Sequence, residues 1–127
     1  MREVILVASF GALGAAGRYG VGLAAQRLWG NAFPWGTLAV NLLGCLLLGF
    51  LMHVVVEREG YSADLRAALG VGFLGAFTTF STFGLDTFGL LENRQWMQAG
   101  ANVALNVVLG LLLVWAGVAV ARFVVGH

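Results

Sequence analysis

Charge is the scarcest property of this 127-residue sequence. Seven arginines, six acidic residues and no lysine make up 10% of the chain, whereas charged residues are about 25% of an average soluble protein. Hydrophobic residues make up 60%. A chain this short cannot bury so much apolar surface in one core, because small domains leave a large share of their surface exposed. The composition therefore excludes a soluble globular domain and a disordered chain, and it indicates a protein of the lipid bilayer.

Other scarcities exclude further classes of protein. The net charge of +1 offers no basic patch, so we expect no nucleic-acid partner. The single cysteine, Cys45, cannot form an intrachain disulfide. The sequence holds no Ser–His–Asp or Cys–His set, and its two histidines, His53 and His127, lie far apart. We therefore do not expect an enzyme.

The few charges divide the chain into apolar segments. The charge-free windows are 4–17, 28–56, 67–85 and 95–121. A membrane-spanning helix needs about 20 mostly apolar residues, and the first window reaches that length by continuing through Arg18. We predict an all-α membrane protein with a single transmembrane domain over 1–127, whose four helices cover about residues 3–28, 35–56, 66–91 and 95–122. The first apolar segment is interpreted as a retained span, because hydrophobic segments continue to the C-terminus.

The arginines are shared almost evenly between the two sides of such a bundle. Four spans place both termini on one side. That side would carry Arg2, Arg58, Arg66 and Arg122, and the other Arg27 and Arg94. Orientation normally follows an excess of Lys and Arg in cytoplasmic loops. The bias here is weak, so we hypothesise that the chain inserts in both orientations.

Nineteen glycines are the second unusual feature, and most fall inside the predicted spans. Gly11, Gly14 and Gly17 recur every three residues in the first span. Small residues let helices in a membrane approach closely, so we interpret this seam as a helix-packing surface. The segment 70–75 also fits the string GxGxxG, but it lies inside an apolar window with no strand before it. We therefore exclude a dinucleotide site.

Two charged residues lie at or near membrane depth, where they are costly and need a reason. Arg18 either extends to the interface or faces a water-filled vestibule and attracts anions. Asp86 is an interfacial charge, an anchor for a helix end or a partner of Arg18. The sequence leaves these alternatives open.

Asparagines lie inside the second and fourth spans. Asn41 follows Thr37 by one turn on the same face, and Asn102, Asn106 and Gly110 repeat at intervals of four residues. Such a stripe either forms interhelical hydrogen bonds or lines a polar track for a solute. Neutral amides can donate hydrogen bonds to an anion without the fixed charge that would trap it. Both interpretations remain open at this point.

The densest signal is the segment 75–83, which reads GAFTTFSTF. Three threonines and a serine compete for backbone hydrogen bonds, and Gly75 adds flexibility, so we predict a break in the third helix near mid-membrane. A break there is tolerated only where it is buried in protein or lines a cavity. Phe80 and Phe83 are three residues apart on one face, and the electropositive edges of aromatic rings can meet an anion.

Three motifs resemble the Fluc (CrcB) family of fluoride channels. They are Gly14-x-x-x-Arg18-Tyr19, Pro34-Trp35-Gly36-Thr37-x-x-x-Asn41 and Gly72-Phe73-Leu74-Gly75-x-x-Thr78-Thr79-Phe80-Ser81-Thr82-Phe83. The third motif is specific, and the first two are moderately so. In length and number of spans the resemblance covers essentially the whole chain.

The resemblance implies a passive fluoride exporter of a microbial inner membrane, assembled as an antiparallel homodimer with two pores. It also implies a structural Na⁺ at the centre of the dimer interface, held by the backbone carbonyls of Gly75 and Thr78 from both subunits. The residues expected along the fluoride pathway are Asn41, Phe80, Ser81, Thr82, Phe83, Asn102 and Asn106. Phe80 and Phe83 would be the pore phenylalanines.

Two other functions compete with a channel. A small proton-coupled exporter of the multidrug type also has four spans, but it needs an ionisable carboxylate well inside a span. Asp86 is the one acid at membrane depth apart from Glu3 at the start of the chain, and the windows 28–56 and 95–121 hold no charge. A scaffold subunit that merely packs against a larger complex would not need the hydroxyl and phenylalanine run. The sequence therefore favours a pathway for a small anion.

Overall fold

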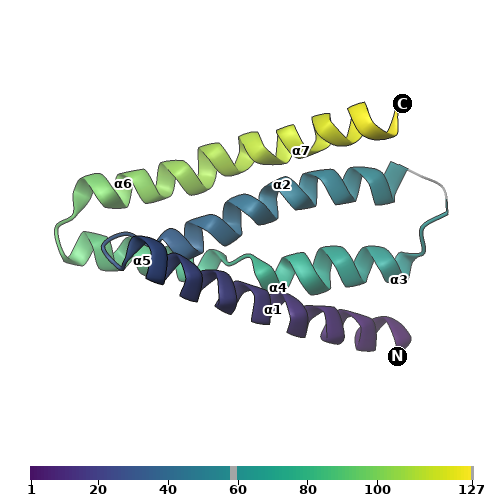
Figure 1. Ribbon diagram of the computed structural model, residues 1–127, viewed down its shortest axis with the longest axis horizontal. Coiled ribbons are helices and arrows are strands. Elements are labelled where there is room, and N and C mark those ends of the chain that lie inside the picture. The colour runs from purple at the N-terminus through teal and green to yellow at the C-terminus, as the bar shows by residue number, and fades with distance from the viewer. Residues whose placement is uncertain (58–59, 127) are drawn as a thin grey trace.

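The computed structural model describes residues 1–57 and 60–126, and these residues form a bundle of helices (Figure 1). Arg58 and His127, which entered the arguments from sequence, lie outside the described residues. The elements are α1 (Arg2–Trp29), α2 (Trp35–Glu57), α3 (Ala63–Arg66), η1 (Ala67–Leu74), α4 (Gly75–Phe77), α5 (Phe80–Glu92), α6 (Trp96–Ala104), η2 (Leu105–Leu109) and α7 (Gly110–Val125). The two η elements are π-helical turns continuous with their neighbours.

The prediction of four membrane-spanning helices is confirmed. The spans are Arg2–Trp29, Trp35–Val56, Ala63–Glu92 and Trp96–Val125, with mean hydropathies between 1.4 and 2.5. Residues 67–77, which contain the GxGxxG string at 70–75, are helical, so the strand-to-helix turn of a dinucleotide site is absent from this segment. Both ends of the described chain lie at the same end of the bundle (Figure 1).

Local sequence accounts for where the spans begin and end. Gly30, with φ of 76°, ends α1. The third span begins at Ser62, whose hydroxyl oxygen accepts a hydrogen bond from the Leu65 N–H at 3.2 Å and so caps the helix. It ends at Asn93, and Arg94 then turns the chain with φ of 56°. These caps place polar groups at the ends of apolar helices, where backbone groups lack helical partners.

The predicted break in the third helix is confirmed at two consecutive residues. Thr78 has φ −87° and ψ 162°, and Thr79 has φ −152° and ψ 119°. Both conformations are extended, so α4 ends and α5 begins on a new axis. Lengths of helix on each side still allow the whole segment Ala63–Glu92 to span the bilayer.

Glycines let the helices approach to backbone contact. A Cβ placed on Gly49 would overlap the Val114 carbonyl, and one on Gly117 would overlap the Leu46 carbonyl, so α2 and α7 need both glycines. Gly14 meets the backbone of Phe73 in the same way, which joins α1 to η1. The predicted seam on α1 is therefore a packing surface against the third span, as small residues provide in membranes.

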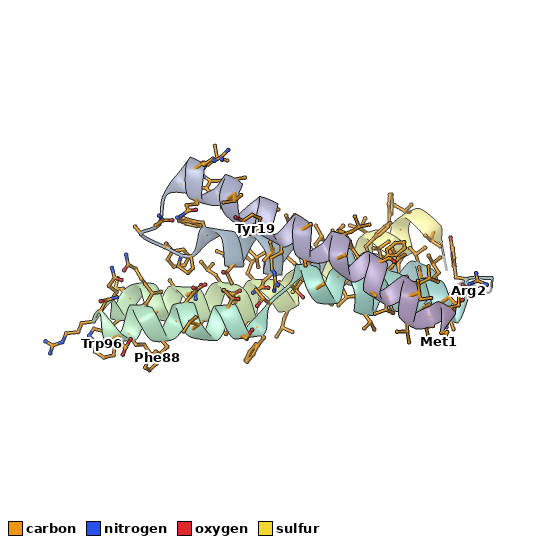
Figure 2. The ribbon with its side chains drawn as sticks, turned by 90° about the horizontal axis from the view of Figure 1, so that it is seen from below. Met1, Arg2, Tyr19, Phe88 and Trp96 are labelled. Atoms are coloured by element: carbon orange, nitrogen blue, oxygen red, sulfur yellow. The ribbon has the colours of Figure 1, made fainter. Side chains whose placement is uncertain are left out.

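The bundle opens at one end. Helix α5 packs along α6 and meets α2 over a short stretch. Figure 2 shows the second half of α1, which carries Tyr19, diverging from α5 and α6. Large apolar side chains on α5 consequently remain exposed, among them Phe80, Leu85 and Phe88.

Candidate functional site

The break in the third helix is shaped by its own threonines. The Thr78 hydroxyl and N–H both donate to the Leu74 carbonyl, at 3.0 and 3.1 Å, and so finish the first half-helix. The Thr79 hydroxyl oxygen accepts the Thr82 N–H at 3.2 Å and caps α5. Thr79 also donates to the Thr82 hydroxyl at 3.0 Å. The hydroxyl run thus replaces the backbone bonds that the break removes, as the competition between Thr side chains and the helix predicts.

Asn41 of α2 holds the extended Thr79 from the side. Its Oδ1 accepts the Thr79 N–H at 2.8 Å, and its Nδ2 donates to the Thr79 carbonyl at 3.0 Å. An extended residue presents both groups toward one amide, so the two bonds form together. Thr79 is 8% exposed, and a buried break of this kind needs such partners.

A chain of hydrogen bonds runs from Asn41 into the fourth span. Asn41 Nδ2 donates to Asn106 Oδ1 at 2.9 Å, and Asn106 Nδ2 donates to the carbonyl and the Oδ1 of Asn102, at 2.8 and 3.0 Å. Asn102, which is 0% exposed, donates to the Thr87 hydroxyl at 2.9 Å. Thr87 donates in turn to the Phe83 carbonyl at 2.8 Å. The asparagine stripe therefore forms interhelical bonds.

Two backbone carbonyls at the break lose the donors that a continuous α-helix would supply. The helical partner of a carbonyl is the N–H four residues later, which for Gly75 is that of Thr79 and for Thr78 that of Thr82. The Thr79 N–H binds Asn41 Oδ1, and the Thr82 N–H binds Thr79 Oγ1. These are the two carbonyls expected to hold Na⁺.

A cation at this position would need such backbone oxygens. Among residues 1–57 and 60–126, no group of three or more His, Cys, Asp or Glu side chains lies together. Gly75 is exposed on the surface of the single chain, so a second molecule could bring further oxygens to it. Main-chain carbonyls at a break in a membrane helix are suitable ligands for Na⁺.

The two predicted pore phenylalanines contact each other but differ in exposure. Their ring centroids lie 5.6 Å apart, with the planes tilted by 53°. Phe83 is 9% exposed, whereas Phe80 is 83% exposed. A cavity of about 250 Å³ is lined by both rings together with Asn41, Thr78 and Asn106. The structure thus brings five of the predicted residues to one cavity.

A second cavity, of about 560 Å³, lies between α1, α2 and the break. Arg18, Thr37, Thr79 and Thr82 are among the residues that line it. Arg18 thus lies beside a cavity that the break also lines, which is the position that an anion-attracting vestibule residue would need. Ser81 is exposed on α5, and it lines neither of these two cavities.

Asp86 pairs with a hydroxyl instead of with an arginine. Its Oδ2 accepts a hydrogen bond from Thr37 at 2.8 Å. The ion pair found in the described part of the chain joins Arg2 and Asp64 at 3.2 Å. Asp86 and Thr37 also line a third cavity, of about 490 Å³, near the joint between α1 and α2. This hydrogen bond joins the middle of α5 to the beginning of α2.

Thr79 and Thr87 are the polar residues whose roles the sequence did not reveal. Thr79 was part of a motif, but its place at the centre of the break follows from its extended backbone and from Asn41. Thr87 lies four residues after Phe83, the spacing at which a helical hydroxyl reaches a carbonyl. That spacing was the one signal for it, because its other partner, Asn102, is on a different helix.

Comparison with known proteins gives a consistent result. The family model described as "CrcB-like protein, Camphor Resistance (CrcB)" matches residues 5–118. A protein of Geobacter sulfurreducens is 45% identical over 122 residues, covering 96% of this chain and 98% of that protein. One of Dehalococcoides mccartyi is 46% identical over 117 residues (92% and 90%), and one of Rhizobium johnstonii is 47% identical over 122 residues (96% and 98%). All three relatives are named fluoride-specific ion channel FluC.

Proposed function

Because this chain belongs to the CrcB family, we propose that it is a subunit of a fluoride-selective channel and that it lets fluoride leave the cell passively. The observation that carries the proposal is the break in the third span, where Phe80 and Phe83 meet at a cavity whose lining also includes Asn41, Thr78 and Asn106. The relatives that match nearly the full length of this chain are named as such a channel. The protein is a transport protein of the multi-pass membrane type and not an enzyme.

The residues at the break suit a small anion. Aromatic ring edges are electropositive, and hydroxyls can donate hydrogen bonds without carrying a charge that would trap the ion. Phe80, Phe83, Ser81 and Thr82 supply these groups around α5. Arg18 lines the neighbouring cavity, where its charge would raise the local concentration of anions. The pathway would therefore select by size and by hydrogen bonding.

A structural Na⁺ belongs to the proposal. The carbonyls of Gly75 and Thr78 would hold it, because the helical donors of both carbonyls are bound elsewhere. The positive charge of the ion would stabilise the carbonyl ends of the α4 half-helices from two subunits, which would face each other.

An antiparallel homodimer in the inner membrane completes the proposal. Phe80 and Leu85 are 83% and 71% exposed on the single chain, and Gly75 of the same span is exposed as well. A second copy against this face would cover the apolar rings and bring two more carbonyls to the cation. The evenly shared arginines permit insertion in both orientations.

The direct test is fluoride efflux from liposomes that contain the purified protein. We expect fluoride to leave down its own gradient once the membrane potential is dissipated, and at an unchanged rate when a protonophore removes any proton gradient. Liposomes without protein are the control. Efflux that requires a proton gradient would contradict the proposal and favour a proton-coupled exporter.

A further inference from the structure

We infer that Asn41 and Thr79 are positioning residues that keep the helical break open. The inference rests on the proposed function, because it assigns these two side chains to the proposed cation site at Gly75 and Thr78. It concerns how this chain builds the site, which the sodium proposal alone leaves undefined.

Two side-chain acceptors at the break each take the N–H that would otherwise bond one of the two carbonyls. Asn41 Oδ1 takes the Thr79 N–H, the helical donor of the Gly75 carbonyl. Thr79 Oγ1 takes the Thr82 N–H, the helical donor of the Thr78 carbonyl. If either acceptor were absent, its N–H would lose its partner, and the carbonyl four residues earlier is the acceptor that a regular α-helix would offer it. Each acceptor therefore keeps one carbonyl available for a cation.

The donors of Asn41 are already used. Its amide carries two protons, and they go to the Thr79 carbonyl at 3.0 Å and to Asn106 Oδ1 at 2.9 Å. The orientation of the amide is fixed, because Thr79 offers a backbone donor to one end and a backbone acceptor to the other. Asn41 is therefore bonded to Thr79 at both ends of its amide and is held against the fourth span.

The next residue in the chain of bonds is saturated as well. Both amide protons of Asn106 go to Asn102, one to its carbonyl and one to its Oδ1. The Asn102 carbonyl fixes the direction of that amide in turn. Asn41 and Asn106 thus form the wall of the cavity beside Phe80 and Phe83, and they differ in one respect. Asn41 diverts a backbone N–H of the break, whereas Asn106 does not.

That difference supplies a matched pair of variants, Asn41→Leu and Asn106→Leu. Each removes one amide from the same cavity, but only Asn41→Leu releases the Thr79 N–H. The measurement is the rise in melting temperature of the purified channel as Na⁺ replaces N-methylglucamine. We expect Asn41→Leu to raise the half-saturating Na⁺ concentration at least tenfold, and Asn106→Leu to leave it within twofold of the unsubstituted protein.

A second pair keeps the test decisive if Asn41→Leu does not fold. Thr79→Val has the shape of threonine but lacks the acceptor for the Thr82 N–H, whereas Thr79→Ser keeps it. We expect Thr79→Val to weaken the sodium response at least tenfold and Thr79→Ser to retain it. Equal responses in the two Thr79 variants would overturn the inference.

The outcomes separate this inference from the proposed function. If the unsubstituted protein conducts fluoride and Asn41→Leu keeps its sodium response, Asn41 does not position the cation site and the inference is wrong. A sodium response that shifts equally in Asn41→Leu and Asn106→Leu would also overturn it. If the unsubstituted protein conducts no fluoride, the proposed function fails instead.

Discussion

Phe80 and Phe83 lie in contact at the start of α5, yet one ring is 83% exposed and the other 9% exposed, with their centroids 5.6 Å apart. Phe83 belongs to the interior of the single chain, and Phe80 belongs to the face that the proposed partner would cover. The pair therefore connects the cavity beside Asn41 with the open face of α5. An anion that passes between them would meet ring edges on both sides of this boundary.

Replacing either ring by isoleucine should slow fluoride transport. Phe80→Ile and Phe83→Ile remove an electropositive ring edge, and a loss of about 1.4 kcal/mol in the barrier region corresponds to a tenfold lower rate. Fluoride efflux from liposomes measures the rate, and the elution volume in detergent checks the assembly. Phe80→Tyr, which keeps the ring edge, is the control. An isoleucine variant that conducts like the unsubstituted protein would remove its ring from the pathway.

Arg18→Gln should reduce fluoride flux in a way that depends on ionic strength. The guanidinium lines the cavity between α1 and the break, and a charge there attracts anions over a distance that salt shortens. We expect roughly a tenfold loss at 0.01 M salt, where the Debye length is about 30 Å, and a loss below about twofold at 1 M. Arg18→Lys is the control that keeps the charge. The same loss at both salt concentrations would show that Arg18 acts locally.

Asn102→Ala should destabilise the protein. Asn102 is 0% exposed and joins Asn106 to Thr87, so its removal leaves buried groups without partners, at a cost of about 1–2 kcal/mol. Unfolding in detergent measures the change. The exposed Asn93, whose side chain donates to Gly89 of its own helix, is the control, and Asn93→Ala should cost less than about 0.5 kcal/mol. Equal losses of stability in the two variants would show that the buried hydrogen bonds of Asn102 do not stabilise the fold.

Gly117→Ala should loosen α7 from α2. A Cβ there would lie 2.8 Å from the Phe50 nitrogen as well as against the Leu46 carbonyl, and such overpacking costs about 1–3 kcal/mol. Gly20→Ala is the matched control on α1, because a Cβ at Gly20 meets nothing within 4 Å, and alanine favours a helix by about 0.5–1 kcal/mol. The two variants should shift the unfolding midpoint in opposite directions. A stabilised Gly117→Ala would refute the backbone contact.

Labelling can test the antiparallel dimer. Asn31 is exposed in the joint between α1 and α2, so Asn31→Cys in a Cys45→Ala background offers a single thiol near one side of the membrane. If subunits insert in both orientations, an impermeant maleimide should reach about half of the thiols from outside sealed liposomes. Permeabilised liposomes give the total. Labelling of all or none of the thiols from outside would indicate a single topology, and cross-links between the two introduced thiols of one dimer would indicate parallel subunits. Both results together would contradict the proposal.

Much of the fold could be predicted from the sequence, because lipid imposes simple rules. The charge-free windows predicted four spans, and the run of hydroxyls in 75–83 predicted a break in the third, which the structure locates at Thr78 and Thr79. Both predictions depend on local composition. The Thr and Ser side chains compete for backbone hydrogen bonds close to them in sequence, so the break can be predicted from that segment alone.

The pairings between helices were not accessible in the same way. Periodicity placed Asn102 and Asn106 on one face, but it did not identify Thr87 or Asn41 as their partners. Nor did it show which glycines meet, such as Gly117 with the α2 backbone. Those contacts depend on the relative rotation of two helices, which packing sets and which no single segment contains.

Fluoride selectivity can be measured by comparing fluoride and chloride efflux from the same liposomes. Ion-selective electrodes follow each anion in turn, with equal gradients and with the membrane potential dissipated by a potassium ionophore. We expect rapid fluoride efflux, and chloride efflux no faster than that of protein-free liposomes. Equal rates for the two anions, or no fluoride efflux at all, would contradict the proposed function.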